Sequence, residues 1–439
     1  MNIAANSDAL VFFWFRRDLR LEDNHGLYQA LSQKRKVQPI FIFDQNILEK
    51  LHKDDGRISY IYLHIIKLKK ELSSLGSDLW VYFGKPEKIW QEILKQHKVA
   101  AVFANHDYEP YASARDKKIE TILSKNKIPF LTFKDQVIFE KTEVLSGTKT
   151  PYTVYTPYKN KWLSLLQPQS YAAYPTSKMY QFFHRGLVTK LIDLSDLGFN
   201  LNKESTALGF NIDQKTLKCY AAQRDFPIKD STSHIGIHLR FGTVSIRTMV
   251  ALALKHDAST WLSELIWREF FMQVLWNFPY VEHKSFRLQY EKVAWRKNPR
   301  EFKKWCNGQT GYPIVDAGMR QLNKTGYMHN RVRMIVASFL TKHLLMHWSL
   351  GERYFAGLLL DYEMASNNGN WQWAASTGCD AVPYFRIFNP ESQSKKFDPD
   401  FAYIKKWVPE FQTAKYVKPM VDHTLARVRA VAAYSAAIK

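Results

Sequence analysis

The interpretation of this chain starts from the stretch NNGNWQW at residues 367–373, which places two indoles two positions apart and an amide four positions before the first. On an α-helix, positions four apart share a face, whereas positions two apart point about 200° away from each other. Asn367 and Trp371 would therefore face one way and Trp373 another. The spacing predicts a helix that lines two neighbouring cavities and suits a protein that holds two flat ligands side by side.

Length and composition bound the class of protein. A chain of 439 residues exceeds one ordinary hydrophobic core, so we expect two domains, or three. Apolar residues make up 46% of it, and no apolar run approaches the roughly 20 residues that span a bilayer. The N-terminal stretch lacks the basic and small-residue flanks of a signal peptide. We therefore expect a cytoplasmic or nucleoid-associated protein with no membrane partner.

Cysteine usage argues against a disulfide or metal framework. The three cysteines, Cys219, Cys306 and Cys379, are odd in number and far apart along the chain. We expect buried free thiols, and we predict no metal site.

Positive charge is concentrated after residue 150. The formal net charge is +21, with 24 Lys and Arg against 19 Asp and Glu in residues 1–150, and 38 against 22 in residues 151–439. The two balances are therefore +5 and +16. A cationic region with many aromatic residues is typical of proteins that bind a nucleic-acid backbone and its bases. A basic protein without such a partner is the alternative that charge alone leaves open.

The first 135 residues alternate short apolar runs with amphipathic stretches. Apolar runs fall at 10–15, 39–43, 79–83, 99–104 and 130–133, and helical periodicity at 59–75, 86–97 and 112–125. This alternation predicts a doubly wound, Rossmann-like α/β domain with a parallel sheet over residues 1–135. No G-x-G-x-x-G follows the first run, so a Rossmann-type dinucleotide site is not predicted. The charged stretch at 16–20 is either a functional loop or a solvated cluster.

The rest of the chain divides into a connector and a helical region. Residues 136–205 are rich in Pro, Gly, Tyr and Ser, which predicts an irregular connector with short helices. Residues 206–439 carry helical apolar repeats at 243–255, 260–277, 314–324 and 330–347. We therefore expect a large all-helical domain over residues 206–439, joined to the α/β domain by a long connector.

Three groups of polar and aromatic residues fall on the predicted helices. They are Glu264 with Trp267 and Arg268, Asn330 with Met334, and Asp361 with Glu363. Each group has an ordinary structural explanation: a Glu264–Arg268 ion pair worth roughly 0.3–0.5 kcal/mol, a capping Asn before a core Met, and a solvated helix start. From spacing alone, each of the three groups can be either an ordinary structural feature or part of a functional site.

In this order the motifs resemble one protein family over essentially the whole chain. The stretches ELIWREF (264–270), TGYPIVDAGMRQL (310–322), YMHNRVRM (327–334), NNGNWQWAASTGCDAVPYFRIFNP (367–390) and WFRRDLRLEDN (14–24) are similar to the photolyase/cryptochrome flavoproteins. Asn330, Met334 and Asn367 match the class I branch, which repairs cyclobutane pyrimidine dimers. The (6-4) photolyases carry histidines near the first two positions, and plant cryptochromes typically carry an aspartate at the third.

The resemblance implies a non-covalent, U-shaped FAD in the helical domain, active in the reduced form FADH⁻. Asn367 would face N5 of the flavin, and Arg333 and Asp361 would form an ion pair against the ring. The family carries Leu and Ser where this chain has Ile235 and Gly236, so a backbone amide would replace one phosphate contact. The implied cofactor-binding residues are Tyr220, Thr232, Ser233, His234, Ile235, Gly236, Trp261, Arg333, Asp361, Tyr362, Glu363 and Asn367.

The resemblance also implies a DNA partner damaged by ultraviolet light. A pyrimidine dimer would be flipped out of the duplex, at a cost of a few kcal/mol. Trp267 and Trp373 would stack on it, Met334 would form an apolar floor, and a protonated Glu264 would donate to a dimer carbonyl. The implied catalytic residues are Glu264, Asn330, Met334 and Asn367, and the implied DNA-binding residues are Arg224, Glu264, Trp267, Asn330, Arg331, Met334, Trp373 and Gln393.

The implied activity is that of a deoxyribodipyrimidine photo-lyase, a carbon–carbon lyase driven by light. An electron would pass from FADH⁻ to the dimer and return after the cyclobutane ring opens. Trp295, Trp348 and Trp371 match a relay that reduces the flavin. A second, light-harvesting chromophore, either a folate or a deazaflavin, is expected between the domains, and the sequence leaves its identity open.

Two other functions remain as alternatives. One is a cryptochrome-like blue-light photoreceptor, marked by a changed pocket around Asn330, Met334 and Trp373 or by a long C-terminal extension. The other is a general single-strand binder, which would carry no chromophore. We expect a monomer in either case.

Overall fold

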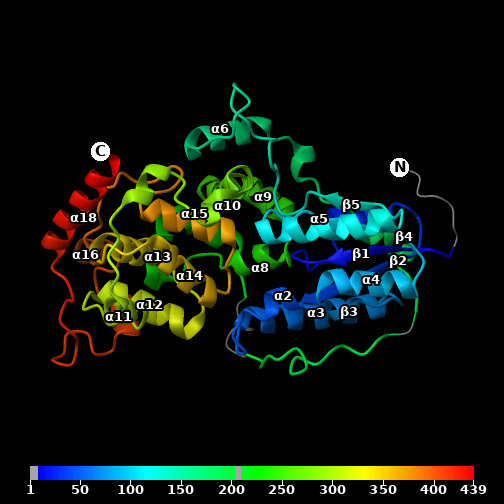
Figure 1. Ribbon diagram of the computed structural model, residues 1–439, viewed down its shortest axis with the longest axis horizontal. Coiled ribbons are helices and arrows are strands. Elements are labelled where there is room, and N and C mark those ends of the chain that lie inside the picture. The colour runs from blue at the N-terminus through cyan, green and yellow to red at the C-terminus, as the bar shows by residue number, and fades with distance from the viewer. Residues whose placement is uncertain (1–7, 187, 203–208) are drawn as a thin grey trace. The chain divides into compact units, whose positions relative to one another are not determined.

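The computed structural model describes residues 8–186, 188–202 and 209–439, which fall into two compact units (Figure 1). Unit 1 comprises Met1–Glu140, Leu166–Gly209 and Ile235–Lys255, and unit 2 comprises Lys141–Leu165, Phe210–His234 and His256–Lys439. The three successive segments expected from the sequence are thus interleaved. The connector is shared between the units, and residues 235–255 belong with the N-terminal part.

Unit 1 is built on a five-stranded parallel sheet, in the order β3-β2-β1-β4-β5. The strands are β1 (Leu10–Phe15), β2 (Val37–Asp44), β3 (Trp80–Gly84), β4 (Val99–Asn105) and β5 (Phe130–Phe133). Every residue of β1 and β2 is buried, as expected for central strands covered on both faces. The predicted doubly wound sheet is confirmed, and the strand order reverses between β1 and β4.

Helices cover both faces of this sheet. Helices α4 (Pro86–Gln96) and α5 (Pro110–Lys125) pack together on the face that carries Phe12 and Trp14, and each begins with a proline at its first position. Helix α1 (His25–Leu31) contacts the opposite face, where Gly26 approaches Phe13. Helix α3 (Gly56–Ser74) starts at the cap residue Asp55. The short α1 and α2 (Gln45–Leu48) were not predicted.

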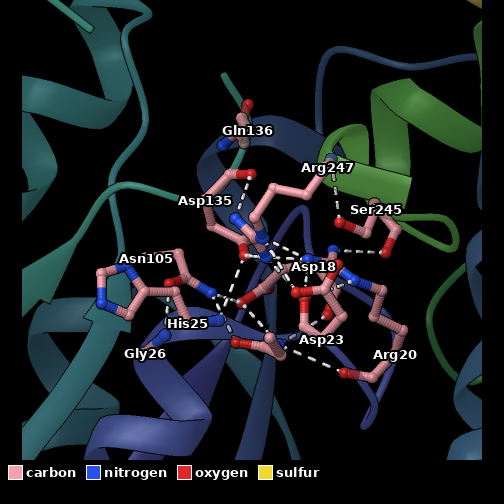
Figure 2. Close-up of polar contacts among 12 residues, drawn as sticks. Asp18, Arg20, Asp23, His25, Gly26, Asn105, Asp135, Gln136, Ser245 and Arg247 are labelled. Atoms are coloured by element: carbon pink, nitrogen blue, oxygen red, sulfur yellow. Dashed lines mark hydrogen bonds and ion pairs between the residues drawn. The ribbon is translucent and has the colours of Figure 1, made fainter. Parts of the chain in front are cut away.

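A buried network of charged side chains ties helix α9 (Ile246–Lys255) to the N-terminal part of unit 1 (Figure 2). Arg247 pairs with Asp23 at 2.8 Å and with Asp135 at 2.7 Å, and Arg20 pairs with Asp135 at 2.8 Å. The side chains of Arg247 and Asp135 are only 5% and 1% exposed. Burial opposes ionisation of Asp135, but the two guanidiniums outweigh it and hold its pKa below the ordinary value.

Unit 2 is helical, as the periodicity predicted. Its α-helices are α6 (Tyr155–Leu165), α7 (Gln214–Gln223), α10 (Ser259–Asn277), α11 (Pro299–Cys306), α12 (Pro313–Thr325), α13 (Asn330–Ser338), α14 (Trp348–Leu358), α15 (Met364–Ala374), α16 (Pro390–Phe397), α17 (Ala402–Trp407) and α18 (His423–Ile438). The helix expected over 330–347 ends earlier, at Ser338, and continues as a π-helical turn over Phe339–His343. The hydrophobic core of unit 2 is formed by aromatic and aliphatic side chains around Trp305 and Val336.

All three cysteines are free: Cys306 and Cys379 are buried and Cys219 is half-buried. None of the helices in the described ranges combines the length and the apolar character that crossing a membrane requires.

Candidate functional site

Helix α15 has the two-faced arrangement expected for residues 367–373. Glu363 is its N-cap residue, and Asn367 and Trp371, one turn apart, are 9% and 2% exposed. Both line a cavity of about 550 Å³, which we call the inner cavity. Trp373 lines the inner cavity and also a second hollow of about 890 Å³, the outer cavity. One helix therefore contributes side chains to two neighbouring spaces in unit 2.

The inner cavity combines an ion pair with aromatic and aliphatic side chains. Arg333 Nη2 lies 2.9 Å from Asp361 Oδ2, and Arg333 Nε donates to the Met328 backbone oxygen at 2.7 Å. The other carboxylate oxygen, Asp361 Oδ1, is buried without a hydrogen-bond partner among the described residues. Such an atom is costly unless a ligand completes it. The lining consists of Asn330, Arg333, Met334, Ala337, Phe355, Leu359, Asp361, Tyr362, Glu363, Ser366, Asn367, Asn370, Trp371, Trp373 and Ala374.

The orientation of Asn367 is fixed by Glu352, a residue that the sequence did not indicate. Asn367 Nδ2 donates to the Glu352 backbone oxygen at 3.1 Å and to its Oε1 at 2.9 Å. Burial raises the pKa of Glu352, and the hydrogen bond from Asn367 opposes part of that rise. With its amide nitrogen engaged, Asn367 keeps its Oδ1 as an acceptor for a donor in the cavity.

The outer cavity is lined by charged and aromatic side chains of α10, α13 and α15. Glu264 pairs with Arg224 at 2.6 Å, and Arg268 pairs with Glu363 at 3.1 Å, so the i,i+4 pair between Glu264 and Arg268 is replaced by two tertiary pairs. Arg224 Nη1 donates to Glu264 Oε1, so the carboxyl group of Glu264 is engaged within the protein. The lining consists of Arg224, Glu264, Trp267, Arg268, Phe271, Asn330, Arg331, Met334, Ser366, Asn370 and Trp373.

The two cavities share one wall. The residues common to both linings are Asn330, Met334, Ser366, Asn370 and Trp373. The two spaces therefore adjoin each other along these five side chains. The sequence indicated the first two and the last of these residues, whereas Ser366 and Asn370 were recognised only from the structure.

Most of the other residues implied to hold the cofactor lie outside the lining of the inner cavity. In unit 2, Trp261 Nε1 donates to Ser233 Oγ at 3.2 Å, Thr232 Oγ1 lies 3.1 Å from Tyr327 Oη, and His234 Nε2 lies 2.6 Å from Asp230 Oδ1. Three further residues are among those implied to hold the cofactor. Tyr220 is buried beneath Arg224, whereas Ile235 and Gly236 belong to unit 1.

Two predicted DNA-binding residues are associated with helix α16. Arg331 lines the outer cavity, pairs with Asp225 at 2.7 Å and lies 4.4 Å above the ring of Phe397. Gln393 is half-buried on α16, outside the described lining of either cavity. The structure thus brings Arg331, and not Gln393, to the outer cavity.

The three indoles of the predicted relay run from the core of unit 2 toward its surface. Trp371 and Trp348 are 2% and 1% exposed, and Trp295 is half-buried. His347 lies between the last two, with ring centroids 5.4 Å from Trp295 and 5.3 Å from Trp348. Gly351, one turn after Trp348 on α14, allows the Trp371 ring to approach, since a Cβ there would lie 2.1 Å from it.

Unit 1 holds a third cavity, of about 810 Å³, near the carboxyl ends of β1, β2 and β4. Arg17 follows β1 and pairs with Asp107 at 3.0 Å and with Glu109 at 3.2 Å. The side chains of Arg16 and Arg17 are 7% and 10% exposed, so the charged stretch after the first strand is not a solvated cluster. This position at a switch in strand order is where α/β sheets bind ligands.

Comparisons with known proteins agree with this architecture. The family model described as DNA photolyase matches residues 11–177, and the model described as FAD binding domain of DNA photolyase matches residues 261–436. The chain belongs to the DNA photolyase family. A deoxyribodipyrimidine photo-lyase from Synechococcus is 34% identical over 97% of this chain and 96% of its own length. Several other curated relatives bear the same enzyme name, and the chain is a photolyase, an enzyme of the carbon–carbon lyase class.

Two solved structures of photolyases have the same fold. A bacterial class III photolyase from Agrobacterium tumefaciens superposes with a TM-score of 0.87 and 33% identity, covering 99% of this chain and 98% of that one. An archaeal photolyase from Sulfolobus tokodaii, whose structure contains two FAD molecules, gives a TM-score of 0.78 and 32% identity, with coverages of 97% and 100%. These comparisons establish the family.

The residues present fit an FAD. Its binding domain is matched over most of unit 2, and three buried polar atoms without a described partner belong to residues at or beside the implied binding set. These atoms are Asp361 Oδ1 in the inner cavity, His234 Nδ1, and Oγ of the neighbouring Ser231. Flavin N–H groups, ribose hydroxyls and phosphates offer the complementary hydrogen-bonding atoms.

Proposed function

We propose that this photolyase repairs cyclobutane pyrimidine dimers in DNA, with FAD in the inner cavity and the flipped-out dimer in the outer cavity. The observation that carries the proposal is the wall shared by the two cavities, which consists of five side chains that line both of them. Two flat ligands on either side of this wall would lie within reach of direct electron transfer. Asn330, Met334 and Asn367, which match the class I pattern, lie on or beside that wall.

The chemistry divides between the cofactor and the protein. When bound in its reduced form, FAD supplies one electron to the dimer on absorbing blue light and takes it back after the cyclobutane bonds break. Asn367, held by Glu352, offers an acceptor oxygen to the flavin edge, and the pair of Arg333 and Asp361 offers a cation and an anion. These groups bind and orient the cofactor, and they need not move during the reaction.

Residues of the outer cavity would bind the lesion. Trp267 and Trp373 supply two flat apolar walls, and stacking of a base on an aromatic ring is worth roughly 1–3 kcal/mol. Met334 offers a polarisable surface between them. Arg224 pairs with Glu264, and an incoming phosphate or pyrimidine carbonyl would compete with Glu264 for the guanidinium of Arg224. Binding would therefore rearrange this pair and free Glu264 to contact the dimer.

The cavity in unit 1 is the site that we assign to a second chromophore. Its lining mixes aromatic and aliphatic side chains with four arginines and three acids, which suits a flat ligand with polar groups at its edge. The residues that line this site all belong to unit 1. Support comes from the Sulfolobus tokodaii photolyase, whose structure contains two FAD molecules.

Illumination of the purified, FAD-containing protein with a thymine-dimer oligonucleotide tests the proposal. We expect blue light to restore thymines, dark samples to remain unchanged, and an oligonucleotide with a (6-4) photoproduct to stay unrepaired. Trp373→Ala removes one wall and should lose most of the dimer binding, whereas Trp407→Ala removes a half-buried indole outside both cavities and should not. Light-induced change in the flavin without repair of the dimer would contradict the proposal and favour a photoreceptor.

A further inference from the structure

One face of Trp267, a wall of the outer cavity, is covered from inside the protein. Tyr155, the first residue of α6, stacks on the indole with ring centroids 3.6 Å apart and planes 9° apart. Tyr155 is 6% exposed and, within the part of the chain that the structure describes, does not line the outer cavity. The indole therefore has one face against Tyr155, and it lines the cavity beside Phe271, whose ring centroid is 5.5 Å away at an interplanar angle of 29°.

The Tyr155 ring is held in this stack by a hydrogen bond from its hydroxyl group. The Tyr155 hydroxyl donates to the Ser263 backbone oxygen at 2.7 Å, and Ser263 Oγ lies 2.6 Å from it. Ser263 precedes Trp267 by one turn on α10, so Tyr155 contacts the same helix at two points. Phe270 meets both rings edge-on, with centroid distances of 5.8 Å to Tyr155 and 5.6 Å to Trp267. The plane of the indole is thus set by two aromatic rings, of which Tyr155 is itself held by its hydroxyl.

Tyr155 is also attached to the loop that follows α15, the helix of the opposite wall. Its backbone N–H donates to Asp380 Oδ2 at 3.2 Å, and Cys379 Sγ donates to the Thr153 backbone oxygen at 2.9 Å. Trp373 lies near the end of α15, a few residues before Cys379. The segment 153–155 therefore lies between the helix that carries Trp267 and the loop that continues from Trp373.

We infer that Tyr155 is a positioning residue for the substrate: it fixes the plane of Trp267 and restricts a stacked pyrimidine to one face of the indole. The inference rests on the proposed function, since stacking of a dimer on Trp267 is part of that proposal. A fixed, half-covered indole loses little conformational freedom when a base stacks on it, so the stacking energy is retained in the affinity. An indole that is free to rotate would lose part of this stacking energy when a base fixes its plane.

The first measurement reads the position of the indole without DNA. In protein labelled with 5-fluorotryptophan, the ¹⁹F resonance of Trp267 is assigned by its disappearance in Trp267→Phe. Tyr155→Leu should shift and broaden this resonance, because the ring current and the contact of the tyrosine are lost. Tyr155→Phe keeps the ring and should keep the resonance near its original position. Tyr155→Met is a second disruptive variant, should Tyr155→Leu not fold.

The second measurement reads the effect on substrate. Tyr155→Leu should weaken binding of a thymine-dimer oligonucleotide about three- to tenfold, the range of a lost aromatic pair, with less than about a twofold change for undamaged DNA. Tyr155→Phe should remain within about twofold of the parent for both. In the Trp267→Leu background, Tyr155→Leu should have no further effect, because a positioning residue acts through the group that it positions.

The outcomes separate this inference from the proposed function. An unchanged Trp267 resonance in Tyr155→Leu overturns the inference whatever the DNA binding. A shifted resonance with an unchanged ratio of damaged to undamaged affinity overturns the role in substrate positioning, as does a full effect in the Trp267→Leu background. If the parent protein itself does not distinguish dimer-containing from undamaged DNA, the proposed function is wrong, and the NMR result alone decides whether Tyr155 sets the indole.

Discussion

Replacing Arg247 by methionine should destabilise unit 1 strongly. The substitution keeps an unbranched side chain of similar length and removes the charge between Asp23 and Asp135, whose side chains are 6% and 1% exposed. Removing one partner of a buried ion pair costs about 3–5 kcal/mol. Asp135 keeps its pair with Arg20 at 2.8 Å, and Asp23 still accepts from the Tyr174 backbone N–H at 2.9 Å. We therefore expect the lower end of the range, about 3 kcal/mol.

Hydrogen exchange followed by mass spectrometry measures this loss within unit 1 alone. Amides of β1 and β4 should exchange roughly a hundredfold faster in Arg247→Met, since about 1.4 kcal/mol corresponds to a factor of ten. Arg320→Met is the matched control: its pair with Glu410 has side chains 27% and 30% exposed, and its loss should cost less than about 1 kcal/mol. Less than a fivefold change in β1 and β4 would show that the network does not stabilise the sheet.

The same variant should change the response to acid. The pKa of Asp135 is held below its ordinary value in the folded protein, so this carboxylate contributes stability above the unfolded pKa of about 4 that is lost as the pH falls toward the folded pKa. In Arg247→Met the pKa of Asp135 in the folded protein lies closer to its ordinary value. Protonation of Asp135 at low pH therefore removes less stability from the variant than from the parent. The difference in hydrogen-exchange protection between the parent and Arg247→Met should therefore narrow below about pH 4. A difference that stays constant from pH 7 to pH 3 would show that ionisation of Asp135 does not cause it.

Three further changes probe unit 2. Gly351→Ala places a Cβ 2.1 Å from the Trp371 ring, and the resulting overpacking should cost about 1–3 kcal/mol in urea unfolding and slow the photoreduction of oxidised FAD. Trp371→Phe should abolish that photoreduction yet leave repair intact once the flavin is reduced chemically; normal photoreduction would remove Trp371 from the relay. Glu352→Gln keeps an acceptor for Asn367 and removes an acid whose folded pKa is raised. Ionisation of Glu352 at high pH therefore destabilises the folded parent, whereas glutamine stays neutral. The variant should be more stable than the parent at pH 8, and this gain should vanish near pH 4.

The sheet of unit 1 was predictable because its strands are continuous apolar runs. Central strands of a parallel sheet are buried on both faces, and β1 and β2 are buried at every residue. The seven residues of α1 contain too few turns for a period to be recognised. The contacts that join residues 235–255 to unit 1 include ion pairs of Arg247 with partners 224 and 112 positions away, which local periodicity does not reveal.

The site was predictable where it lies on one helix and unpredictable where it joins several. The spacing at 367–373 was enough to place Asn367 and Trp371 in one cavity and Trp373 beside another. The partner of Glu264 lies on a separate segment, 40 positions earlier, so helical spacing could offer only Arg268 as a pairing partner. Tyr155, in the stretch expected to be an irregular connector, carried no sequence signal that linked it to Trp267.

The interleaving of the two units has a consequence for synthesis on the ribosome. The sheet is complete by residue 140, but helix α9, which closes the network around Asp135, ends at Lys255. At the usual rates of about 5–20 residues per second, the nascent sheet waits roughly 6–23 s for the intervening 115 residues (141–255). During that interval Asp23 lacks the guanidinium of Arg247, and Asp135 has only its pair with Arg20.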